Sequence, residues 1–401
     1  MSEAVRPRGS DAVSVDREAR IRRALEHLRQ ETTDQFETPV YFAPGEFTDP
    51  ELAERERDLV FGRVPSIVAH SSEIPNTYDY KALRLPRNNV ILSRQRDGSV
   101  KALVNLCRHR GAMLEEEGCG KRRLFSCPYH RWSYDIDGSL RTITRDTTVG
   151  EFDRSQLGLV ELPCEERHGF IWLIDRPGAQ IDVAAWLGEE MDAILAGYDL
   201  GELLCVRSEG FEEPVNWKLM QDAFLDGYHI QYAHPNTAGK IIHTNVMAFE
   251  DFTNHCRFVA PRKTIDRFLE EDPGEQSLVD YVTETHFLGP NVTLLKQPDH
   301  FQLLTFRPHH EDPARSIMEM RLIVPSAERA GMDPERWTRL WDKNWQILIA
   351  VLHEEDFPVL RNSQKAMASK DGGQMVLGRN EVANQLFRRM LDGLLEADAG
   401  A

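Results

Sequence analysis

The sequence predicts an α+β protein of two domains, the first almost entirely β and the second mixed. Short strand-like runs fill the region from about Phe42 to Asp175, whereas the region after Pro177 alternates helical periodicity with strand-like segments. The chain has 401 residues, enough for two domains of ordinary size. We therefore divide it into a disordered tail (1–15), a helical segment (16–41), a small β domain (42–175) and a second domain (176–401).

The N-terminal parts are polar. The tail has no apolar stretch of the kind that signal peptides contain, and no run in the chain approaches the roughly 20 apolar residues that cross a bilayer. From Asp16 to Gln30, apolar residues recur at helical spacing on a charged background, which predicts a surface helix.

Five strands are expected in the β domain, and tight turns at Asp97-Gly98 and Asp137-Gly138 punctuate it. The strands are Ser66–Ala69, Tyr80–Leu85, Asn89–Ser93, Val100–Asn105 and Ile171–Ile174.

In the second domain we expect helices over Trp186–Ala196, Val215–Ala233 and Glu381–Leu395, and strands between about Val246 and Val324, His300–Thr305 being the clearest. Asp333-Pro334 is typical of a helix start, with Asp as the N-cap and Pro in the first turn. The long helix that follows should run toward Leu352.

Composition excludes some partners. The formal net charge of −17 argues against nucleic acid and anionic membranes. Of six cysteines, Cys119, Cys164, Cys205 and Cys256 show no disulfide-like spacing, which is typical of a reducing cytoplasm. We expect a cytoplasmic protein.

Two mixed Cys–His pairs in the β domain indicate a metal site. Cys107 and His109 form the first pair, and Cys127 and His130 form the second. Two thiolates for one iron and two imidazoles for the other are the ligands of a Rieske [2Fe–2S] cluster. Structural zinc also takes two Cys and two His, but zinc fingers usually pair like with like. The intervening residues are expected to form a hairpin arm.

A second group of metal-ligand type lies in the second domain. His229 and His234, with a carboxylate from elsewhere, would make the two-His-one-carboxylate triad of non-heme Fe(II) oxygenases. Five residues turn an ideal helix by about 500°, which would separate the two side chains. Pro235 disfavours helical geometry at His234, so the sequence predicts an irregular helix here. An arbitrary His pair at this spacing is more often two ordinary polar residues.

The carboxylate is expected after the apolar run Ile347–Leu352, where a buried charge needs a partner. Glu354, Glu355 and Asp356 are the candidates, and helical spacing does not choose among them. A solvated acidic helix end is the simpler alternative.

These motifs resemble one family. The segments CRHRGA at 107–112 and CPYHRWSYDIDG at 127–138 are similar to the Rieske domain of ring-hydroxylating oxygenase α subunits. The run D-x2-H-x4-H-P at 226–235, after Asn216-Trp217-Lys218-Leu219, resembles the catalytic motif of the same family. Arg131 departs from the pattern, since the family usually has a small residue there, and Ala223 stands where many members have Asn.

The resemblance implies a fold, ligands and an assembly. The second domain would be a helix-grip (START-like) fold, with an antiparallel sheet around a long C-terminal helix. Asp356, the Asp of a Glu-Asp pair, would be the third iron ligand, with Glu355 as the alternative. Asp226 would connect His130 of one subunit to His229 of its neighbour in a homotrimer, with or without a β subunit, and Asp222 would support this region.

The function implied is that of a terminal oxygenase. A ferredoxin or flavin reductase drawing on NAD(P)H would reduce the [2Fe–2S] cluster, which passes electrons to a mononuclear Fe(II). O2 and an aromatic substrate would react there by dihydroxylation or monooxygenation, with Phe224, Leu225 and strands near 286–303 as pocket walls. The alternative is a Rieske electron carrier with a ligand-binding domain that performs no chemistry.

Overall fold

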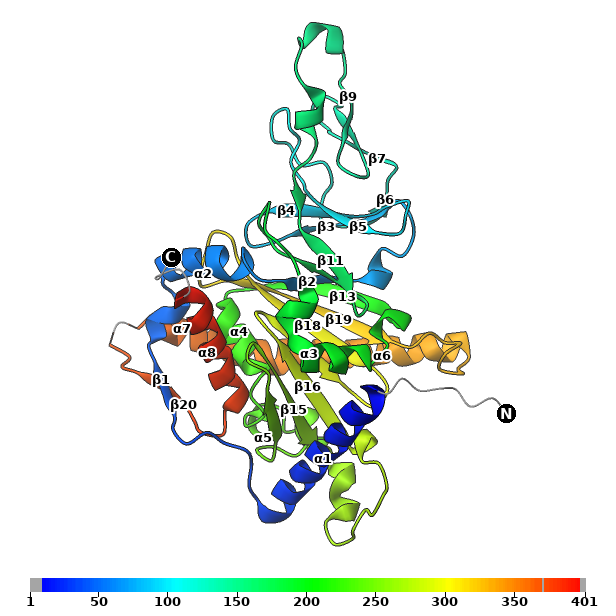
Figure 1. Ribbon diagram of the computed structural model, residues 1–401. Helices are drawn as coiled ribbons and strands as arrows, with labels where there is room; N and C mark the ends of the chain where they lie inside the picture. The colour runs from blue at the N-terminus through cyan, green and yellow to red at the C-terminus, as the bar shows by residue number, and fades with distance from the viewer. Residues whose placement is uncertain (1–8, 370, 397–401) are drawn as a thin grey trace. The chain divides into compact units, whose positions relative to one another are not determined.

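A computed structural model describes residues 9–369 and 371–396 (Figure 1). They divide into two compact units, Glu56–Trp186 and the described parts of Met1–Arg55 with Leu187–Ala401. The first consists of β-sheets and the second combines a large antiparallel sheet with helices. The α+β fold class is confirmed.

The β unit contains three antiparallel sheets. A five-stranded sheet has the order β10-β5-β4-β3-β6, and two three-stranded sheets have the orders β11-β12-β2 and β7-β8-β9. The strands are β2 (Ser66–His70), β3 (Asp79–Arg84), β4 (Asn89–Arg94), β5 (Val100–Val104), β6 (Gly118–Lys121), β7 (Leu124–Ser126), β8 (Ser133–Asp135), β9 (Leu140–Thr142), β10 (Glu161–Leu162), β11 (Cys164–Arg167) and β12 (Phe170–Leu173). The five strands predicted here are confirmed to within one residue.

The expected hairpin arm between the two Cys–His loops is wrong. β6 and β7 follow each other in the chain, but β6 pairs with β3 and β7 pairs with β8. The turn between them is held by the Arg122 N–H, which donates to the Tyr78 carbonyl at 2.8 Å. The two Cys–His loops therefore follow strands of different sheets. The first follows β5 of the five-stranded sheet, and the second follows β7 of the sheet β7-β8-β9.

The larger unit is built on a seven-stranded antiparallel sheet in the order β13-β19-β18-β17-β16-β15-β14. Its strands are β13 (Leu204–Glu213), β14 (Ala248–Asp251), β15 (His255–Pro261), β16 (Val282–Leu288), β17 (Val292–Lys296), β18 (Phe301–Pro308) and β19 (Ser316–Val324). A separate two-stranded sheet joins β1 (Val40–Phe42) to β20 (Met375–Leu377). The α-helices of the chain are α1 (Gly9–Gln30), α2 (Pro50–Glu56), α3 (Val183–Ala196), α4 (Trp217–Ala223), α5 (Ile230–Ala233), α6 (Pro334–Val351), α7 (Phe357–Met367) and α8 (Val382–Glu396).

The unit limits differ from those expected at 42 and 175. Phe42 belongs to β1, whose partner β20 lies in the larger unit, and Phe47 is fully buried there. Helix α1 begins at Gly9, so the part of the predicted tail from Gly9 to Val15 is helical, while Met1–Arg8 lies outside the described residues.

One long helical element crosses the larger unit from Pro334 to Met367. Its start is as predicted, since the Asp333 carboxylate accepts from the Arg336 N–H at 3.0 Å. Between α6 and α7, residues Leu352–Asp356 form a π-helical turn, η10. Pro358 lacks the N–H that an α-helical bond would need, so a wider turn suits this position.

Different helices pack on the two faces of the seven-stranded sheet. Because side chains alternate along a strand, Thr283, Thr285 and Phe287 of β16 face one side, and Glu284 and His286 face the other. Helices α4, α6 and α8 pack on the Phe287 side, where α6 and the end of α4 line a cavity, and α1 lies on the Glu284 side.

Candidate metal centres

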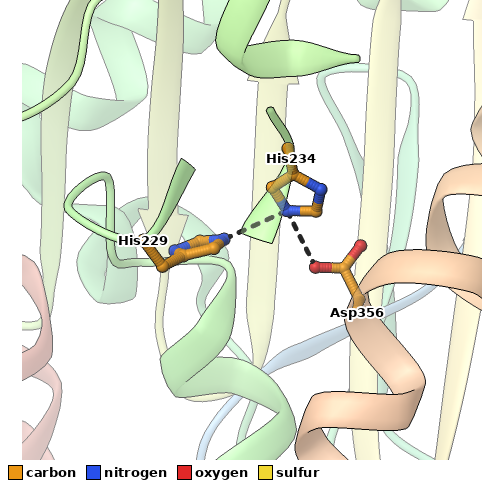
Figure 2. Close-up of side chains that lie close together, drawn as sticks. All are labelled: His229, His234 and Asp356. Carbon is orange, nitrogen blue, oxygen red and sulfur yellow. Dashed lines mark hydrogen bonds and ion pairs between the residues drawn. The ribbon is translucent and has the colours of Figure 1, made fainter. Parts of the chain in front are cut away.

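Three metal-ligand atoms converge at one end of the cavity. Nε2 of His229 lies 3.2 Å from Nε2 of His234, which lies 3.1 Å from an Asp356 oxygen (Figure 2). One ligand atom from each residue lies within 4.8 Å of the others. His234 and Asp356 are buried, with 5% and 8% of their surface exposed. The structure thus brings together the three residues predicted to hold the mononuclear iron.

The local chain path explains how His229 and His234 meet. The predicted helix over Val215–Ala233 is wrong as a single element, because α4 ends at Ala223 and α5 is one turn. The Asp226 carboxylate caps the intervening bend by accepting from the Tyr228 N–H at 2.5 Å. His229 precedes α5, and His234 has left helical geometry at φ −117° and ψ 44°. The irregularity expected at Pro235 is present.

Gly227 lets this bend approach the sheet. A Cβ built on Gly227 would lie 1.5 Å from Cε of Met247, so a larger residue would displace one of the two. No positive φ is involved, and the requirement is close approach alone.

A carboxylate lies behind each imidazole. Asp226 is 3.2 Å from Nδ1 of His229, and Glu355 is 2.6 Å from Nδ1 of His234. When each Nδ1 donates its proton to the carboxylate behind it, both Nε2 atoms are left as lone-pair acceptors. Two imidazole lone pairs and the Asp356 carboxylate then face one another, an arrangement that a cation would stabilise. The donor set fits a mononuclear iron.

Glu355 was the runner-up ligand in the sequence, and the structure gives it this supporting position. It also accepts from the Thr237 hydroxyl at 2.6 Å. Burial would raise the pKa of Glu355, but the hydrogen bonds from Thr237 and His234 lower it overall. For His234, burial lowers the pKa, yet Asp356 and Glu355 outweigh burial and raise it. Thr237 gave no sequence signal, since a hydroxyl three residues after His234 is common.

The cavity has a volume of about 970 Å³. Its walls beyond the three convergent residues are mainly apolar, from the sheet, from α6 and from the turn after α4; they include Phe224, Ile242, Phe258, Leu295, Leu304, Met320, Leu348 and Leu352. Phe224 was expected in the wall. Leu225, also expected there, is 1% exposed and is not among the lining residues.

Asp222 has a structural role. Its carboxylate pairs with Arg388 of α8 at 2.8 Å, and Asn384 of α8 donates to its carbonyl at 2.8 Å. Burial raises the pKa of Asp222 in spite of this pairing. Asp222 thus connects α4 to α8 through an ion pair and a hydrogen bond. Helix α4 directly precedes the bend that carries His229.

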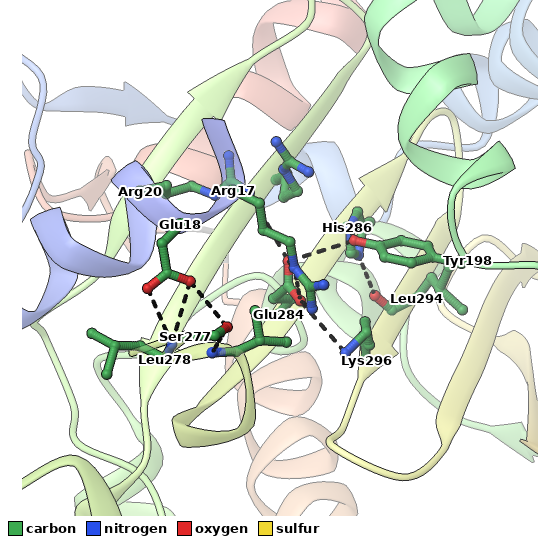
Figure 3. A network of polar contacts seen from close by, with 12 residues as sticks. Arg17, Glu18, Arg20, Tyr198, Ser277, Leu278, Glu284, His286, Leu294 and Lys296 are labelled. Atoms are coloured by element: carbon green, nitrogen blue, oxygen red, sulfur yellow. Dashed lines mark hydrogen bonds and ion pairs between the residues drawn. The ribbon is translucent and has the colours of Figure 1, made fainter. Parts of the chain in front are cut away.

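A second polar cluster lies on the opposite face of the sheet (Figure 3). Arg17 of α1 donates to both oxygens of Glu284, at 2.9 and 3.0 Å, and His286 Nε2 lies 2.9 Å from the Tyr198 hydroxyl. Burial would raise the pKa of Glu284, but Arg17 and its neighbours hold it at about 2. Burial lowers the pKa of His286 to about 3. These charges fix α1 to the sheet and are separate from the cavity.

The two Cys–His loops of the β unit are built alike. The Cys107 N–H donates to the Ala112 carbonyl and the Gly111 N–H donates to the Cys107 carbonyl, both at 2.9 Å. In the second loop, the Cys127 N–H donates to Trp132 at 2.8 Å and the Arg131 N–H donates to Cys127 at 3.0 Å.

Arg131 occupies the glycine-like position of its loop. Gly111 and Arg131 both stand four residues after the cysteine, with φ of +76° and +59°. This left-handed region costs a non-glycine residue roughly 1–2 kcal/mol. The backbone at this position therefore favours glycine, and Arg131 is accommodated with strain.

The four predicted cluster residues present suitable donors. Cys107 and Cys127 are buried, at 1% and 2% exposure, and the rings of His109 and His130 lie 4.6 Å apart. Nδ1 of His130 is buried with no hydrogen-bond partner among the described residues. Burial and the nearby His130 and Arg110 lower the pKa of His109, which favours the neutral imidazole that binds metal. These residues fit an iron–sulfur cluster.

Two aromatic residues beside the loops were not predicted. Trp132 stacks on His109 with 4.8 Å between ring centroids, and the Tyr134 hydroxyl lies 3.4 Å from Sγ of Cys107. Both belong to the motif segment after His130. Their aromatic character was visible in the sequence, but their partners in the other loop were not.

Comparison with known proteins agrees with both sites. Residues 65–153 match the Rieske [2Fe–2S] domain, and residues 200–397 match the ring hydroxylating alpha subunit (catalytic domain). The two matches cover the two Cys–His loops and the three cavity residues. The chain belongs to the Rieske non-heme iron oxygenase α subunits. The cofactors typical of this family are a Rieske [2Fe–2S] cluster and a mononuclear iron.

Individual relatives differ in what their names say they act on. The chain is 34% identical over 202 residues to the anthranilate 1,2-dioxygenase large subunit of Acinetobacter baylyi, covering 49% of this chain and 43% of that one. It is 32% identical over 196 residues to the carnitine monooxygenase oxygenase subunit of Escherichia coli, covering 49% and 52%. The chain thus spans about half the length of the relatives it matches.

Solved structures share the fold over most of the chain. A quaternary ammonium Rieske monooxygenase has a TM-score of 0.75 at 21% identity, covering 89% of this chain and 96% of that one. A naphthalene 1,2-dioxygenase from Rhodococcus sp. has a TM-score of 0.72 at 18% identity, covering 96% and 100%. Among the described helices, none has the length and apolar character needed to cross a membrane.

Proposed function

We propose that the protein is the terminal oxygenase component of a Rieske non-heme iron oxygenase system. Cys107, His109, Cys127 and His130 would hold the [2Fe–2S] cluster, and His229, His234 and Asp356 would hold Fe(II). The observation that carries the proposal is the convergence of two Nε2 atoms and a carboxylate oxygen within 4.8 Å, at the end of a cavity large enough for an organic molecule. When bound, the cluster accepts single electrons and the ferrous ion offers open positions for O2.

The protein side chains orient and shield this centre. Asp226 and Glu355 fix the two imidazoles through Nδ1, which sets the tautomer and increases the basicity of Nε2. The apolar side chains of the wall, such as those of Phe224 and Leu352, would favour contact with the carbon skeleton of a substrate. A substrate packed against these walls would place its carbon atoms beside the metal-binding end.

An aromatic substrate suits the walls better than a quaternary ammonium ion. Sites for quaternary ammonium groups commonly surround the cation with Trp or Tyr rings. The residues that line this cavity include Phe224 and Phe258 but no Trp or Tyr within the described part of the chain. Oxygen would enter such a substrate by ring dihydroxylation or by monooxygenation.

The external partners follow from the proposed electron path. A ferredoxin or flavin reductase would supply electrons from NAD(P)H. Asp226 would link His229 to His130 of a neighbouring subunit, so that electrons cross between subunits of a homotrimer. The six cysteines are all unpaired, which fits the reducing cytoplasm expected for such a system.

An isotope experiment tests the oxygenase proposal. The purified protein, a reductase and NADPH are incubated under 18O2 with a panel of aromatic compounds, and products are identified by mass spectrometry. We expect a product that carries 18O, and His229→Ala should abolish it while the electron paramagnetic resonance (EPR) signal of the reduced cluster persists.

The electron-carrier alternative predicts the opposite pattern. No compound would gain 18O, and His229→Ala would leave electron transfer from the reductase to an added acceptor such as cytochrome c unchanged. A zinc protein would give neither colour nor an EPR signal.

A further inference from the structure

One wall of the cavity carries an arginine that has no anionic partner among the described residues. Arg262 follows β15, and its Nη1 donates to Oε1 of Gln297 at 2.9 Å. Within the described residues, no carboxylate lies within 4 Å of its guanidinium nitrogens. Burial lowers the pKa of Arg262, and the charge of Asp299 opposes this only in part. The half-buried guanidinium thus has a neutral amide, and no carboxylate, as its side-chain partner among the described residues.

The acid whose charge acts on Arg262 is Asp299, which already binds another residue. Asp299 holds Nδ1 of His300 at 2.8 Å, and this hydrogen bond, together with the Arg262 charge, lowers the pKa of Asp299. The side chain of Asp299 is 66% exposed, so water screens its charge. It therefore does not neutralise Arg262 as a buried ion pair would.

The groups around Arg262 suit an oxyanion. Oε1 of Gln297 accepts from both Arg262 and the Thr283 hydroxyl, at 2.9 and 3.0 Å, so the amide nitrogen of Gln297 remains a donor. Lys240, also in the cavity wall, adds a second positive charge. A guanidinium presents two parallel N–H groups that match a carboxylate, and such charge-assisted pairs are about twice as strong as neutral hydrogen bonds.

The position of Arg262 is tied to the metal-binding bend. The His234 carbonyl accepts from the Gly239 N–H at 2.9 Å, and the Ile241 carbonyl accepts from the Lys263 N–H at 2.8 Å. On its other side, the Arg262 N–H donates to Tyr281 at 2.8 Å. Backbone hydrogen bonds therefore connect the segment after His234 to the residues that follow β15, where Arg262 lies.

We propose that Arg262 binds the anionic group of the substrate, and that the cavity takes small organic acids, with a carboxylate at Arg262 and the carbon skeleton against the apolar walls. The inference deepens the proposed function by naming its substrate class. Binding itself is independent of turnover, so the two can fail separately.

Calorimetry with matched probes tests the proposal. Benzoate, phenylacetate and 3-phenylpropanoate are titrated into the iron-loaded full chain under anaerobic conditions, each beside its neutral amide. We expect at least one acid to bind about ten- to a hundredfold more tightly than its amide, and Arg262→Gln to remove that preference. Arg262→Lys should restore part of it, since a charge remains but the planar fork does not.

The matched control is Arg267→Gln. Arg267 lies five residues after Arg262, is exposed and is not part of the cavity wall, so this variant loses the same charge at a different place. Equal losses in the two variants would show a general charge effect and would overturn the proposal. Binding that survives Arg262→Gln but disappears in His229→Ala would place the carboxylate on the metal instead. Amides or benzyltrimethylammonium that bind as tightly as the acids, or no saturable binding of any acid, would also overturn it. Measurement of 18O incorporation stays a separate test of the oxygenase.

Discussion

Replacement of Glu355 tests the idea that the carboxylates behind the imidazoles prepare the metal site. Glu355→Gln keeps the size and leaves an amide oxygen that can still accept from His234 Nδ1, which lies 2.6 Å from the carboxylate in the structure. Only the charge is lost. The fold and the three convergent ligands should be retained.

The expected magnitude follows from that single contact. A hydrogen bond to a charged group contributes about 1.5–3 kcal/mol and a neutral one about 0.5–1.5 kcal/mol. The difference of roughly 1–1.5 kcal/mol corresponds to about a tenfold loss of Fe(II) affinity. Glu355→Ala removes the acceptor altogether and should cost about 10- to 100-fold, the usual range for partners behind metal-bound histidines.

The assay is anaerobic competition for Fe(II) against a chelator, with the cluster signal as an internal measure of intact protein. Glu354→Gln is the matched control, because Glu354 is the adjacent acid and is exposed. Equal iron affinities for the Glu355 and Glu354 variants would refute the reasoning.

Three further predictions concern other parts of the chain. Arg131→Gly should stabilise the β unit by about 1 kcal/mol in urea unfolding, because glycine adopts the positive φ of 59° without strain; an unchanged midpoint would contradict this. The pKa of His286 is about 3 in the folded state against an ordinary 6.5, so its contribution to stability is complete above pH 6.5 and is lost as the pH falls toward 3. His286→Gln should therefore flatten the acid slope of unfolding free energy by up to about 1.4 kcal/mol per pH unit, and an equally steep slope would argue against it. Asp226→Asn should leave both metal sites filled but slow reoxidation of the reduced cluster in the presence of substrate and O2; stopped-flow rates equal to the wild type would exclude the bridge between subunits.

Much of the fold could be predicted because local signals and tertiary structure agree. The strands of the β domain have short apolar runs bounded by turn residues, and the start of α6 has its own N-cap at Asp333. The predictions failed where the decisive contact is distant in sequence. Phe42 pairs with Met375, and Phe47 is buried within the larger unit, so the domain limit near residue 42 had no local signal.

The metal ligands could be proposed because their chemistry restricts them to few residue types at fixed spacing. The bend before His229 could not be placed from periodicity, since it depends on Gly227 fitting against Met247 and on the Asp226 cap. The same limit applies to Glu355 and Asp356. Helical spacing did not separate them, and the π-helical turn η10 decides that Asp356 faces the two imidazoles while Glu355 lies behind His234.

Arg262 shows what sequence alone cannot supply. It is one of many arginines, and only the structure shows that it lines the cavity and has no carboxylate partner in the part of the chain that is described. The observation that marks Arg262 as a binding residue is its lack of an ion pair among the described residues. The spacing of residues in a sequence does not reveal such a lack.

The most direct test of the central claim is the iron and acid-labile sulfide content of the anaerobically reconstituted protein and of Asp356→Ala. We predict three irons and two sulfides per wild-type chain, and two of each in the variant, with the EPR signal of the reduced cluster unchanged. A variant that retains the third iron, or a wild-type protein that never takes up more than two, would contradict the assignment of His229, His234 and Asp356 as a mononuclear iron site.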